Sequence, residues 1–355
     1  MAVNFIEIEG FKSIKNAHID LAPINILIGA NGSGKSNFIS FFEFLNNLYE
    51  QKLEEYISLG GGQEKILFQG LKTTSQIKAL LSFNSGVNAY SFTLKSGEDN
   101  MIFTEENLWF NDNAWAMSNY TSKALVKTNT EGRGEYINKF LKSFRKYHFH
   151  DTGRNSPFTE TSHIENDSYF LYEEGRNLAA FLYHINNFDK IIYNRIIKTI
   201  QSIAPYFSDF FFQPNANGFL RLQWQSKYSS TIYGASDLSD GSLRFIALTT
   251  LFLQPNLPNT IIIDEPELGL HPFAITKLAG MIKSATSKGS QVILATQSAD
   301  LINHFKAEDI IAVDQIDGES TFKRLKDESL KTWLEEYNLG DLWQKNIITE
   351  GQPNQ

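Results

Sequence analysis

Apolar and polar residues follow two different periods in the first fifty residues. Asn4 to Glu9 alternate as the residues of a half-buried strand do, and Pro23 to Ile28 form a second, mostly apolar strand. From Asn37 to Tyr49 the apolar residues recur at helical spacing. The pattern therefore predicts a strand, a glycine-rich loop and a helix in succession.

The middle of the chain predicts antiparallel strands followed by helices. The β-like runs Ile77–Phe83, Ala89–Leu94 and Met101–Phe110 are separated by Asn, Ser and Gly, which favours hairpins. Residues 177–204 are helical in period, with a break at Asn186–Asn187, and a further β run follows at 219–224. Residues 110–225 hold no sustained heptads, which argues against a long coiled coil.

After residue 238 the pattern becomes helix, strand, helix, strand. Helices are predicted over 243–253 and 272–284, and short apolar strands over 260–263, 291–296 and 309–316. Buried strands that alternate with helices are typical of a parallel sheet in an α/β core.

Composition and charge exclude several classes of protein. The chain has 355 residues, of which 42% are apolar and 20% charged, so it is globular rather than disordered. A net charge of −8 excludes a uniformly basic nucleic-acid coat but not a local basic groove. The absence of cysteine excludes disulfides, thiol catalysis and cysteine-ligated metals. With acids in the first ten residues and no run of about 20 apolar residues, we expect a cytoplasmic protein without a membrane partner.

The glycine-rich loop is the strongest chemical signal. Residues 29–36, Gly-Ala-Asn-Gly-Ser-Gly-Lys-Ser, match the P-loop pattern G-x-x-x-x-G-K-S/T between a strand and a helix. Its glycines let backbone N–H groups surround a phosphate, and the helix adds its positive N-terminus. Lys35 is expected to reach the β- and γ-phosphates, and Ser36 to ligate Mg²⁺. The predicted ATP-binding residues are Lys12, Ser13, Gly29, Asn31, Gly32, Ser33, Gly34, Lys35, Ser36 and Asn37.

A second signal is a pair of acids at the end of an apolar strand. Ile261-Ile262-Ile263 runs into Asp264-Glu265-Pro266, at the edge where α/β folds bind ligands. Asp264 is expected to hold Mg²⁺ through water, and Glu265 to polarise the attacking water. An acidic helix cap is the alternative, which the complete P-loop disfavours. No N-K-x-D guanine-reading loop is present, so ATP is favoured over GTP.

A third signal resembles the LSGGQ signature of ABC-type ATPases. Leu238-Ser239-Asp240-Gly241-Ser242 opens a predicted helix, with Asp240 in place of a glycine and Ser242 in place of a glutamine. In that superfamily the signature of one subunit closes over the γ-phosphate held by the other. The resemblance implies that Ser239, Asp240 and Gly241 act in trans, within an ATP-sandwiched dimer.

Further motifs extend the resemblance over nearly the whole chain. Gly10-Phe11-Lys12-Ser13 is similar to a turn of SMC and RecF-like heads where the basic residue faces the nucleotide. Residues 265–272 look like the D-loop region, and Gln297 lies where SMC-type heads have a switch histidine. The chain thus resembles a bacterial family of stand-alone AAA, ABC-type ATPases related to RecF, SMC and OLD proteins, without the Toprim nuclease domain of OLD proteins.

The resemblance implies a fold and a division of the chain. We expect an α/β P-loop NTPase of the ABC-ATPase (RecF/SMC head) type with an antiparallel β layer. Residues 1–110 would form an N-terminal lobe with the P-loop, 111–225 a mainly helical insertion, and 226–355 a C-terminal lobe with signature, acidic pair and switch. Catalytic roles are expected for Lys35, Glu265 and Gln297, although glutamine cannot carry the charge of a histidine.

Two weaker clusters have open interpretations. His148, His150 and Asp151 suggest a metal site, but only the two histidines share a face of the predicted strand, so a structural or nucleotide-sensing role is favoured. Asp151 is one candidate for a Q-loop-like contact, and Gln69 is another. The basic clusters 142–146 and 323–326 could touch nucleic-acid phosphates, but a solvated face is the favoured interpretation.

These features imply an ATP-hydrolysing switch that needs ATP and Mg²⁺. The family resemblance implies that it forms a homodimer or higher oligomer through ATP. The resemblance also implies that it gates a separate nuclease or other effector in bacterial DNA maintenance, DNA repair or anti-phage defence, and that DNA is a candidate contact. The alternative is a non-hydrolysing, ATP-bound oligomeric scaffold, which the departures at Asp240 and Gln297 favour. The energising subunit of a transporter is disfavoured by the long insertion between Lys35 and Asp264.

Overall fold

The computed structural model describes residues 3–98, 100–118 and 120–348. It divides the chain into two compact units. The first comprises Met1–Lys146, Pro258–Asp264 and Gly289–Gln355, and the second comprises Tyr147–Leu257 and Glu265–Lys288. Residues 111–146 thus belong to the first unit. The domain ranges 1–110, 111–225 and 226–355 stay a prediction about how the chain is organised.

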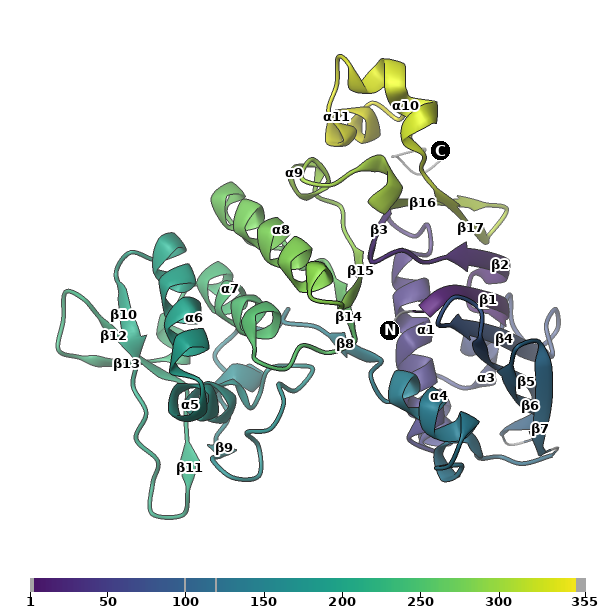
Figure 1. The fold of residues 1–355 in the computed structure, drawn as a ribbon, viewed down its shortest axis with the longest axis horizontal. Helices are drawn as coiled ribbons and strands as arrows, with labels where there is room; N and C mark the ends of the chain where they lie inside the picture. The colour runs from purple at the N-terminus through teal and green to yellow at the C-terminus, as the bar shows by residue number, and fades with distance from the viewer. Residues whose placement is uncertain (1–2, 99, 119, 349–355) are drawn as a thin grey trace. The chain divides into compact units, whose positions relative to one another are not determined.

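An antiparallel sheet forms one layer of the first unit (Figure 1). Its six strands follow the order β2-β1-β4-β5-β6-β7, and consecutive strands from β4 to β7 are joined as hairpins. The antiparallel layer predicted from the alternating runs is confirmed. The strands are β1 (Val3–Phe11), β2 (Ile14–Asp20), β4 (Gln76–Phe83), β5 (Asn88–Ser96), β6 (Met101–Phe110) and β7 (Asn113–Ser118).

A mainly parallel sheet forms the other layer, in the order β17-β16-β3-β15-β14-β8. Strands β16, β3, β15 and β14 run parallel, and their central residues are buried. The predicted α/β core is therefore present. The strands are β3 (Ile24–Ile28), β8 (Arg145–Tyr147), β14 (Thr260–Asp264), β15 (Gln291–Ala295), β16 (Ile310–Ile316) and β17 (Glu319–Arg324).

Helix α1 (Lys35–Tyr49) supplies much of the core between these sheets. Phe41 and Phe44 of α1 pack against Phe11 of β1, with ring centroids 5.2 and 5.3 Å apart. The buried rings of the unit explain why phenylalanine is so frequent in this chain. The other helices are α2 (Leu53–Leu59), α3 (Gln63–Ile66), α4 (Arg133–Leu141), α9 (Ala299–Ile302), α10 (Asp327–Leu334) and α11 (Leu339–Gln344).

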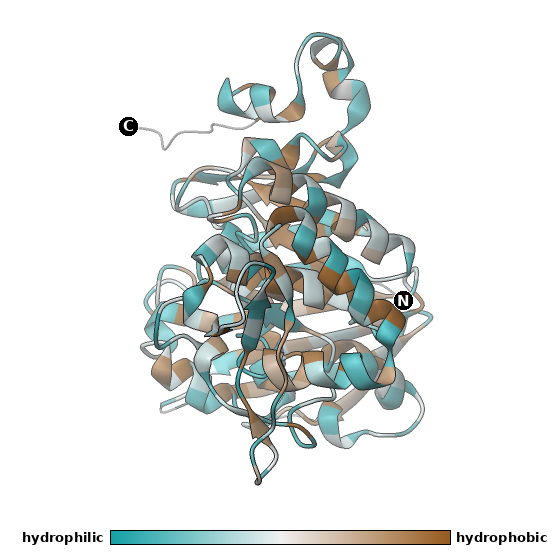
Figure 2. Ribbon diagram, turned by 90° about the vertical axis from the view of Figure 1, so that its left-hand side faces the viewer, coloured by the Kyte–Doolittle hydropathy of each residue, from teal (hydrophilic) through white to brown (hydrophobic). Residues whose placement is uncertain are grey.

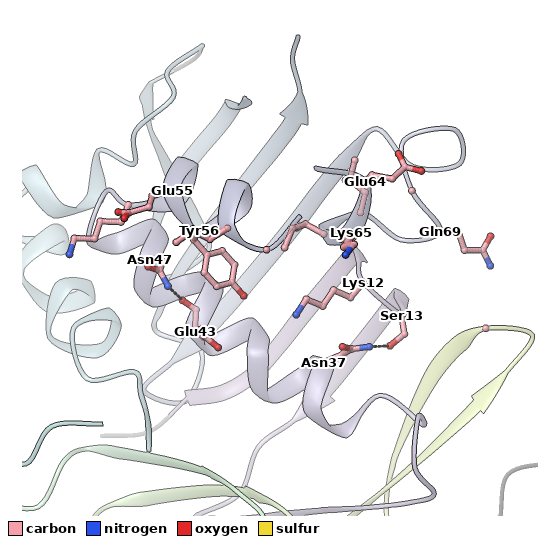
Figure 3. Close-up of a pocket in the computed structure, with 17 residues that line it drawn as sticks. Lys12, Ser13, Asn37, Glu43, Asn47, Glu55, Tyr56, Glu64, Lys65 and Gln69 are labelled. Atoms are coloured by element: carbon pink, nitrogen blue, oxygen red, sulfur yellow. Dashed lines mark hydrogen bonds between the residues drawn. The ribbon is translucent and has the colours of Figure 1, made fainter. Parts of the chain in front are cut away.

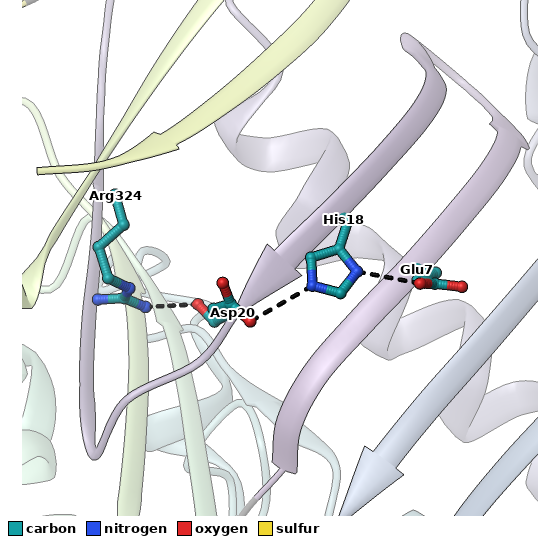
Figure 4. A network of polar contacts seen from close by, with 4 residues as sticks. All are labelled: Glu7, His18, Asp20 and Arg324. Atoms are coloured by element: carbon teal, nitrogen blue, oxygen red, sulfur yellow. Dashed lines mark hydrogen bonds and ion pairs between the residues drawn. The ribbon is translucent and has the colours of Figure 1, made fainter. Parts of the chain in front are cut away.

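A polar network ties the two sheets of the first unit together at their edges (Figure 4). His18 of β2 lies between two acids, with Nδ1 3.0 Å from Glu7 Oε1 and Nε2 3.3 Å from Asp20 Oδ1. Arg324 of β17 donates to the backbone oxygen of Asp20 at 2.7 Å. The hydrogen bond to Glu7, together with Asp20, raises the pKa of His18.

The second unit is built on four helices, with α7 packed against both α6 and α8 (Figure 1). They are α5 (Leu178–Phe188), α6 (Lys190–Ile203), α7 (Asp240–Leu253) and α8 (Pro272–Ser287). Short strands β10 (Phe207–Phe210), β12 (Gln223–Ser226) and β13 (Ile232–Gly234) form one antiparallel sheet, and β9 (Ser162–His163) pairs with β11 (Phe219–Leu220). Short 3₁₀ turns lie at Val126–Thr128, Pro157–Thr159, Ala235–Asp237 and Ala307–Asp309.

Two details of the second unit differ from the sequence prediction. The β run predicted over 219–224 is interrupted, because Leu220 pairs with Ser162 while Trp224 pairs with the sheet of β10 and β13. The break between α5 and α6 falls at Asp189 instead of at Asn186–Asn187. Asp189 caps α6 by accepting a hydrogen bond from the backbone N of Ile192 at 3.0 Å.

Hydrophobic residues alternate with hydrophilic ones along the helices, as expected of elements that bury one face (Figure 2). None of the helices in the described ranges is long and apolar enough to cross a membrane.

Candidate functional site

Three sequence motifs meet at one edge of the parallel sheet. β3 runs directly into the P-loop, β15 ends at Ala295 just before Thr296 and Gln297, and β14 ends at Asp264. The strands are neighbours, with Asp264 paired to Ala295 and Ala295 paired to Leu27. Because parallel strands end at a common edge, the register brings the P-loop, Gln297 and Asp264 to the same side of the sheet.

The P-loop leaves no room for a side chain at Gly34. Its φ of 111° lies in the left-handed region, and an added Cβ would stand 2.0 Å from Ser320 Oγ and 3.0 Å from Ser13 Oγ. Gly34 caps α1 without a side-chain hydrogen bond. The backbone N–H groups of the first turn are therefore available to an external acceptor.

Ser320 of β17 fastens the P-loop to the turn that carries Lys12 and Ser13. Its hydroxyl donates to the backbone oxygen of Ser33 at 2.7 Å and lies 2.7 Å from Ser13 Oγ. Ser13 Oγ in turn accepts a hydrogen bond from Asn37 Nδ2 at 2.7 Å. Ser320 is fully buried. The structure thus adds a residue that no sequence motif marked, more than 280 positions after the P-loop.

The loop has the donor set that a nucleotide phosphate and Mg²⁺ require. Lys35 is 5% exposed, and its Nζ donates to the backbone oxygens of Gly29 and Ala30, both at 2.8 Å. The hydroxyl of Ser33 is buried without a hydrogen-bond partner in the described chain. Together with the N–H groups at the start of α1, these polar groups fit a phosphate. Ser36 and Asp264 supply oxygen atoms, which are the ligands that Mg²⁺ prefers.

A pocket of about 1070 Å³ begins where the P-loop ends (Figure 3). Lys12 and Ser13 line it from the β1–β2 turn, and Asn37, Glu43 and Asn47 from α1. Its size is at the upper end of small-molecule sites. Further lining residues from the segment of α2, α3 and the following turn include Tyr56, Glu64, Lys65 and Gln69.

Lys12 points into this pocket, and its pKa is lowered there. Its Nζ donates to Ser40 Oγ at 2.8 Å. Burial lowers the pKa of Lys12, the carboxylate of Glu43 raises it in part, and Lys146 lowers it further. A cation that is already partly desolvated interacts more strongly with an anionic ligand. The position of Lys12 and Ser13 is compatible with nucleotide binding, and their role there stays a prediction.

Glu265 follows Asp264 in an unusual backbone conformation. Its φ of 43° is left-handed, which is rare for a residue with a side chain. Such conformations concentrate at functional sites, where the surrounding structure holds them. The division between the two compact units falls between these two residues. Asp264 belongs to the first unit, and Glu265 belongs to the second.

Within the second unit, the signature-like residues form a capped helix start. Ser239 accepts a hydrogen bond from the backbone N of Ser242 at 3.3 Å and is exposed together with Asp240. Gly241 lies so close to the D-loop region that an added Cβ would stand 2.4 Å from the backbone oxygen of Gly269. The trans role of Ser239, Asp240 and Gly241 stays a prediction.

Arg244 links three motifs of the second unit through hydrogen bonds. It lies one turn after Gly241, is 5% exposed, and donates from Nε to Phe149 O at 2.9 Å and from Nη2 to His150 O at 3.0 Å. Nη1 donates to Leu268 O. Burial lowers its pKa, partly offset by Asp240. One guanidinium therefore fixes the signature helix, the histidine segment and the D-loop region together.

This arrangement corrects the interpretation of the histidine segment. β8 ends at Tyr147, so His148 and His150 follow the strand and do not lie on it. Their backbone groups are hydrogen-bonded to residues outside the sheet. His148 N donates to Glu173 O at 3.0 Å, and Arg244 occupies the carbonyl of His150. The described residues hold no cluster of three or more metal-ligating side chains. The Q-loop-like role of Asp151, whose carboxylate accepts from the Gly153 N–H at 3.1 Å, stays a prediction.

The sequence of residues 24–303 matches the family model described as "AAA domain, putative AbiEii toxin, Type IV TA system". The chain belongs to this AAA domain family. No curated protein matches the chain by sequence.

Solved structures similar to this AAA domain include SMC heads. An SMC head bound to the C-winged helix domain of ScpA gives a TM-score of 0.62 at 18% identity over 93% of this chain and 99% of that one. A Pyrococcus furiosus SMC head with an extended coiled coil, bound to the C-terminal domain of ScpA, gives 0.60 at 16% identity over 94% and 98%. The SMC head domain of Thermotoga maritima gives 0.50 at 15% identity over 92% and 100%. The expected P-loop NTPase fold of the SMC-head type is confirmed.

Proposed function

We propose that the protein is an ATP-hydrolysing switch that needs Mg²⁺. The observation that carries this proposal is the meeting of the P-loop, Asp264 and Gln297 at one edge of the parallel sheet, beside a pocket of about 1070 Å³. The pocket takes the nucleoside, and the P-loop takes the phosphates. Bound Mg²⁺ supplies charge neutralisation of the β- and γ-phosphates.

Each residue has a distinct role in the proposed reaction. Lys35 exchanges its backbone carbonyl partners Gly29 and Ala30 for phosphate oxygens, and Ser36 and Asp264 would hold the metal. Glu265 accepts a proton from the attacking water or orients it. Gln297 donates a hydrogen bond to the γ-phosphate or the water, which positions them without adding charge.

Closure of two heads on ATP is the proposed output of the switch. Ser239, Asp240 and Gly241 of one copy contact the γ-phosphate bound by the other, so ATP links a homodimer or higher oligomer. The family description names a toxin–antitoxin system, and two of the similar SMC heads were solved with a domain of ScpA. Both support a separate partner protein. We propose a nuclease or other effector, acting on DNA or in anti-phage defence in the cytoplasm.

Three substitutions test the proposal. Glu265→Gln should lower ATP turnover by about a hundredfold or more while ATP binding persists. Lys35→Ala should abolish ATP binding, because it removes the cation at the phosphates. Glu308→Gln, at an exposed acid remote from the motifs, is the matched control and should leave turnover unchanged. If the wild-type protein turns over ATP no faster than the Glu265→Gln variant does, the proposal that the protein hydrolyses ATP is wrong.

A non-hydrolysing scaffold is the second candidate, favoured by Asp240 in the signature and Gln297 at the switch. In that case ATP holds an oligomer together without being consumed. Native mass spectrometry with ATP and Mg²⁺ separates the two. If the protein is a switch, only the Glu265→Gln variant should form a stable dimer with ATP. If it is a scaffold, the wild-type protein should stay oligomeric and its bound ATP should remain intact after hours.

A further inference from the structure

Two helices of the second unit carry an excess of positive charge. α6 and α8 together hold five basic residues and no acidic one, although the chain has a net charge of −8. The basic residues are Lys190, Arg195, Lys198, Lys277 and Lys283. Both helices pack on α7 within one compact unit. A local cluster of one sign in an otherwise acidic chain points to an anionic ligand.

Three of these cations line a groove of about 510 Å³ between α6 and α8. Arg195 and Lys198 are one turn apart on α6, and Lys277 faces them from α8. The remaining lining is Ile191, Asn194, Thr199 and Ser202, so no carboxylate faces the groove. A polar and basic lining of this kind suits phosphates better than it suits an apolar small molecule.

The three cations have no anionic partner within the described chain. The ion pairs of the described residues all lie elsewhere, and Arg195, Lys198 and Lys277 take part in none of them. In each of the two basic clusters considered from the sequence, at least one member already has a partner. Lys146 lies 3.6 Å from Glu43, and Arg324 donates to the backbone of Asp20 and Glu308.

A row of exposed rings adjoins the groove. Phe188, at the end of α5, is 77% exposed, and Ile191 at the groove is 84% exposed three residues later. The ring of Phe188 lies 4.5 Å from that of His184, which lies 6.2 Å from that of Tyr169, itself 75% exposed. Large exposed rings next to unpaired cations are the combination that binds single-stranded nucleic acids, since every base has a face that stacks.

We propose that the α6–α8 groove binds single-stranded nucleic acid. Arg195, Lys198 and Lys277 contact consecutive phosphates, and Phe188 and Tyr169 stack on the bases that enter or leave the groove. The exposed rings favour a single strand over a duplex, whose bases are already stacked on one another. All of these residues lie in the second unit, so the proposal goes beyond the ATPase switch and does not depend on it.

Fluorescence anisotropy with labelled single-stranded dT20 tests this proposal, using the full chain without nucleotide at 50–300 mM salt. The triple variant Arg195→Ala/Lys198→Ala/Lys277→Ala should reduce the slope of log K against log salt by about 2, since each single-strand phosphate contact contributes about 0.7. Phe188→Ala should weaken binding about tenfold or more, with little change in that slope. Lys288→Ala, at the exposed end of α8 outside the groove, is the control and should bind as wild type does.

Each alternative has its own outcome. Tighter binding of a 20-base-pair duplex than of dT20, with no effect of Phe188→Ala, would overturn the single-strand assignment. Binding of an acidic polyglutamate peptide in place of dT20 would assign the groove to a protein partner. An unchanged salt slope in the triple variant would remove the groove from nucleic-acid binding altogether. ATP turnover of the triple variant, measured in parallel, keeps this result separate from the test of the ATPase.

Discussion

Ser13 and Ser320 lie more than 300 positions apart in the sequence, and their hydroxyl oxygens are 2.7 Å apart next to the P-loop. Ser320 also donates to the backbone oxygen of Ser33, so β17 is hydrogen-bonded to the loop itself. The conformation that presents these N–H groups to a phosphate therefore depends on a strand at the far end of the chain.

Ser320→Ala should weaken ATP binding about 5- to 30-fold, because it removes one buried and one partly buried hydrogen bond, worth roughly 1 kcal/mol each. Ser320→Thr, which keeps the hydroxyl, should retain more of the affinity. Isothermal titration calorimetry measures both. The control is Ser82→Ala, at a buried serine of β4 outside the pocket, which should leave the ATP affinity unchanged. Equal affinities of Ser320→Ala and wild type would show that the loop holds its shape without β17.

Gly34→Ala should abolish ATP binding. The new Cβ would stand 2.0 Å from Ser320 Oγ, so either the loop or the strand must move. Gly32→Ala is the matched comparison. Gly32 also has a positive φ, of 82°, but nothing lies within 4 Å of the position of its Cβ. The backbone strain is therefore similar while the clash is absent, and Gly32→Ala should keep measurable affinity. The idea is wrong if the two variants lose affinity equally.

The affinity for ATP should fall as the pH rises from 7 to 10. Burial lowers the pKa of Lys12 from 10.5, so this lysine loses its charge at a lower pH than an exposed lysine does. Lys12→Met should bind ATP more weakly at pH 7 and show a flatter profile, and Lys12→Arg should keep its affinity to higher pH. Lys15→Met, at an exposed lysine paired with Glu319, controls for the loss of general charge. Binding of a fluorescent ATP analogue across this range gives the profiles.

Arg244→Ala should destabilise the second unit by about 3 kcal/mol or more, because three carbonyl oxygens lose a charged donor inside the protein. Arg244→Lys should recover only part of this, since one ammonium cannot reach all three. Arg195→Ala, at an exposed arginine of the same unit, should change stability by less than about 0.5 kcal/mol. Urea unfolding followed by tryptophan fluorescence compares the three, and similar midpoints for both alanine variants would contradict the assigned role.

His18 should contribute stability at low pH only. Its pKa is raised above 6.5, first by the hydrogen bond to Glu7, so the folded state holds the proton more tightly than the unfolded state does. This contribution is complete below pH 6.5 and is lost as the pH rises through the raised pKa. The effect is small, because the ring is half exposed. His18→Asn should lower the urea midpoint at pH 5.5 more than at pH 8.5, and an equal change at both would disprove the linkage.

Much of the first unit could be predicted from local patterns. The P-loop, the acidic pair after Ile263 and the hairpins between residues 76 and 110 follow from spacing, because glycine conformation, strand alternation and helix period are properties of short segments. Neither Ser320 nor Arg244 carries a local signal. Their roles arise only when a distant strand or loop approaches them.

The P-loop, the acidic strand end and the alternation of strands and helices typical of an SMC-type head can be read from short stretches of this sequence. That β17 holds the P-loop, that Arg244 joins three motifs, and that Arg195, Lys198 and Lys277 share one groove follows only from the folded chain. A motif is written in consecutive residues, whereas register and helix packing set which distant side chains meet. Those depend on how the whole hydrophobic core is buried.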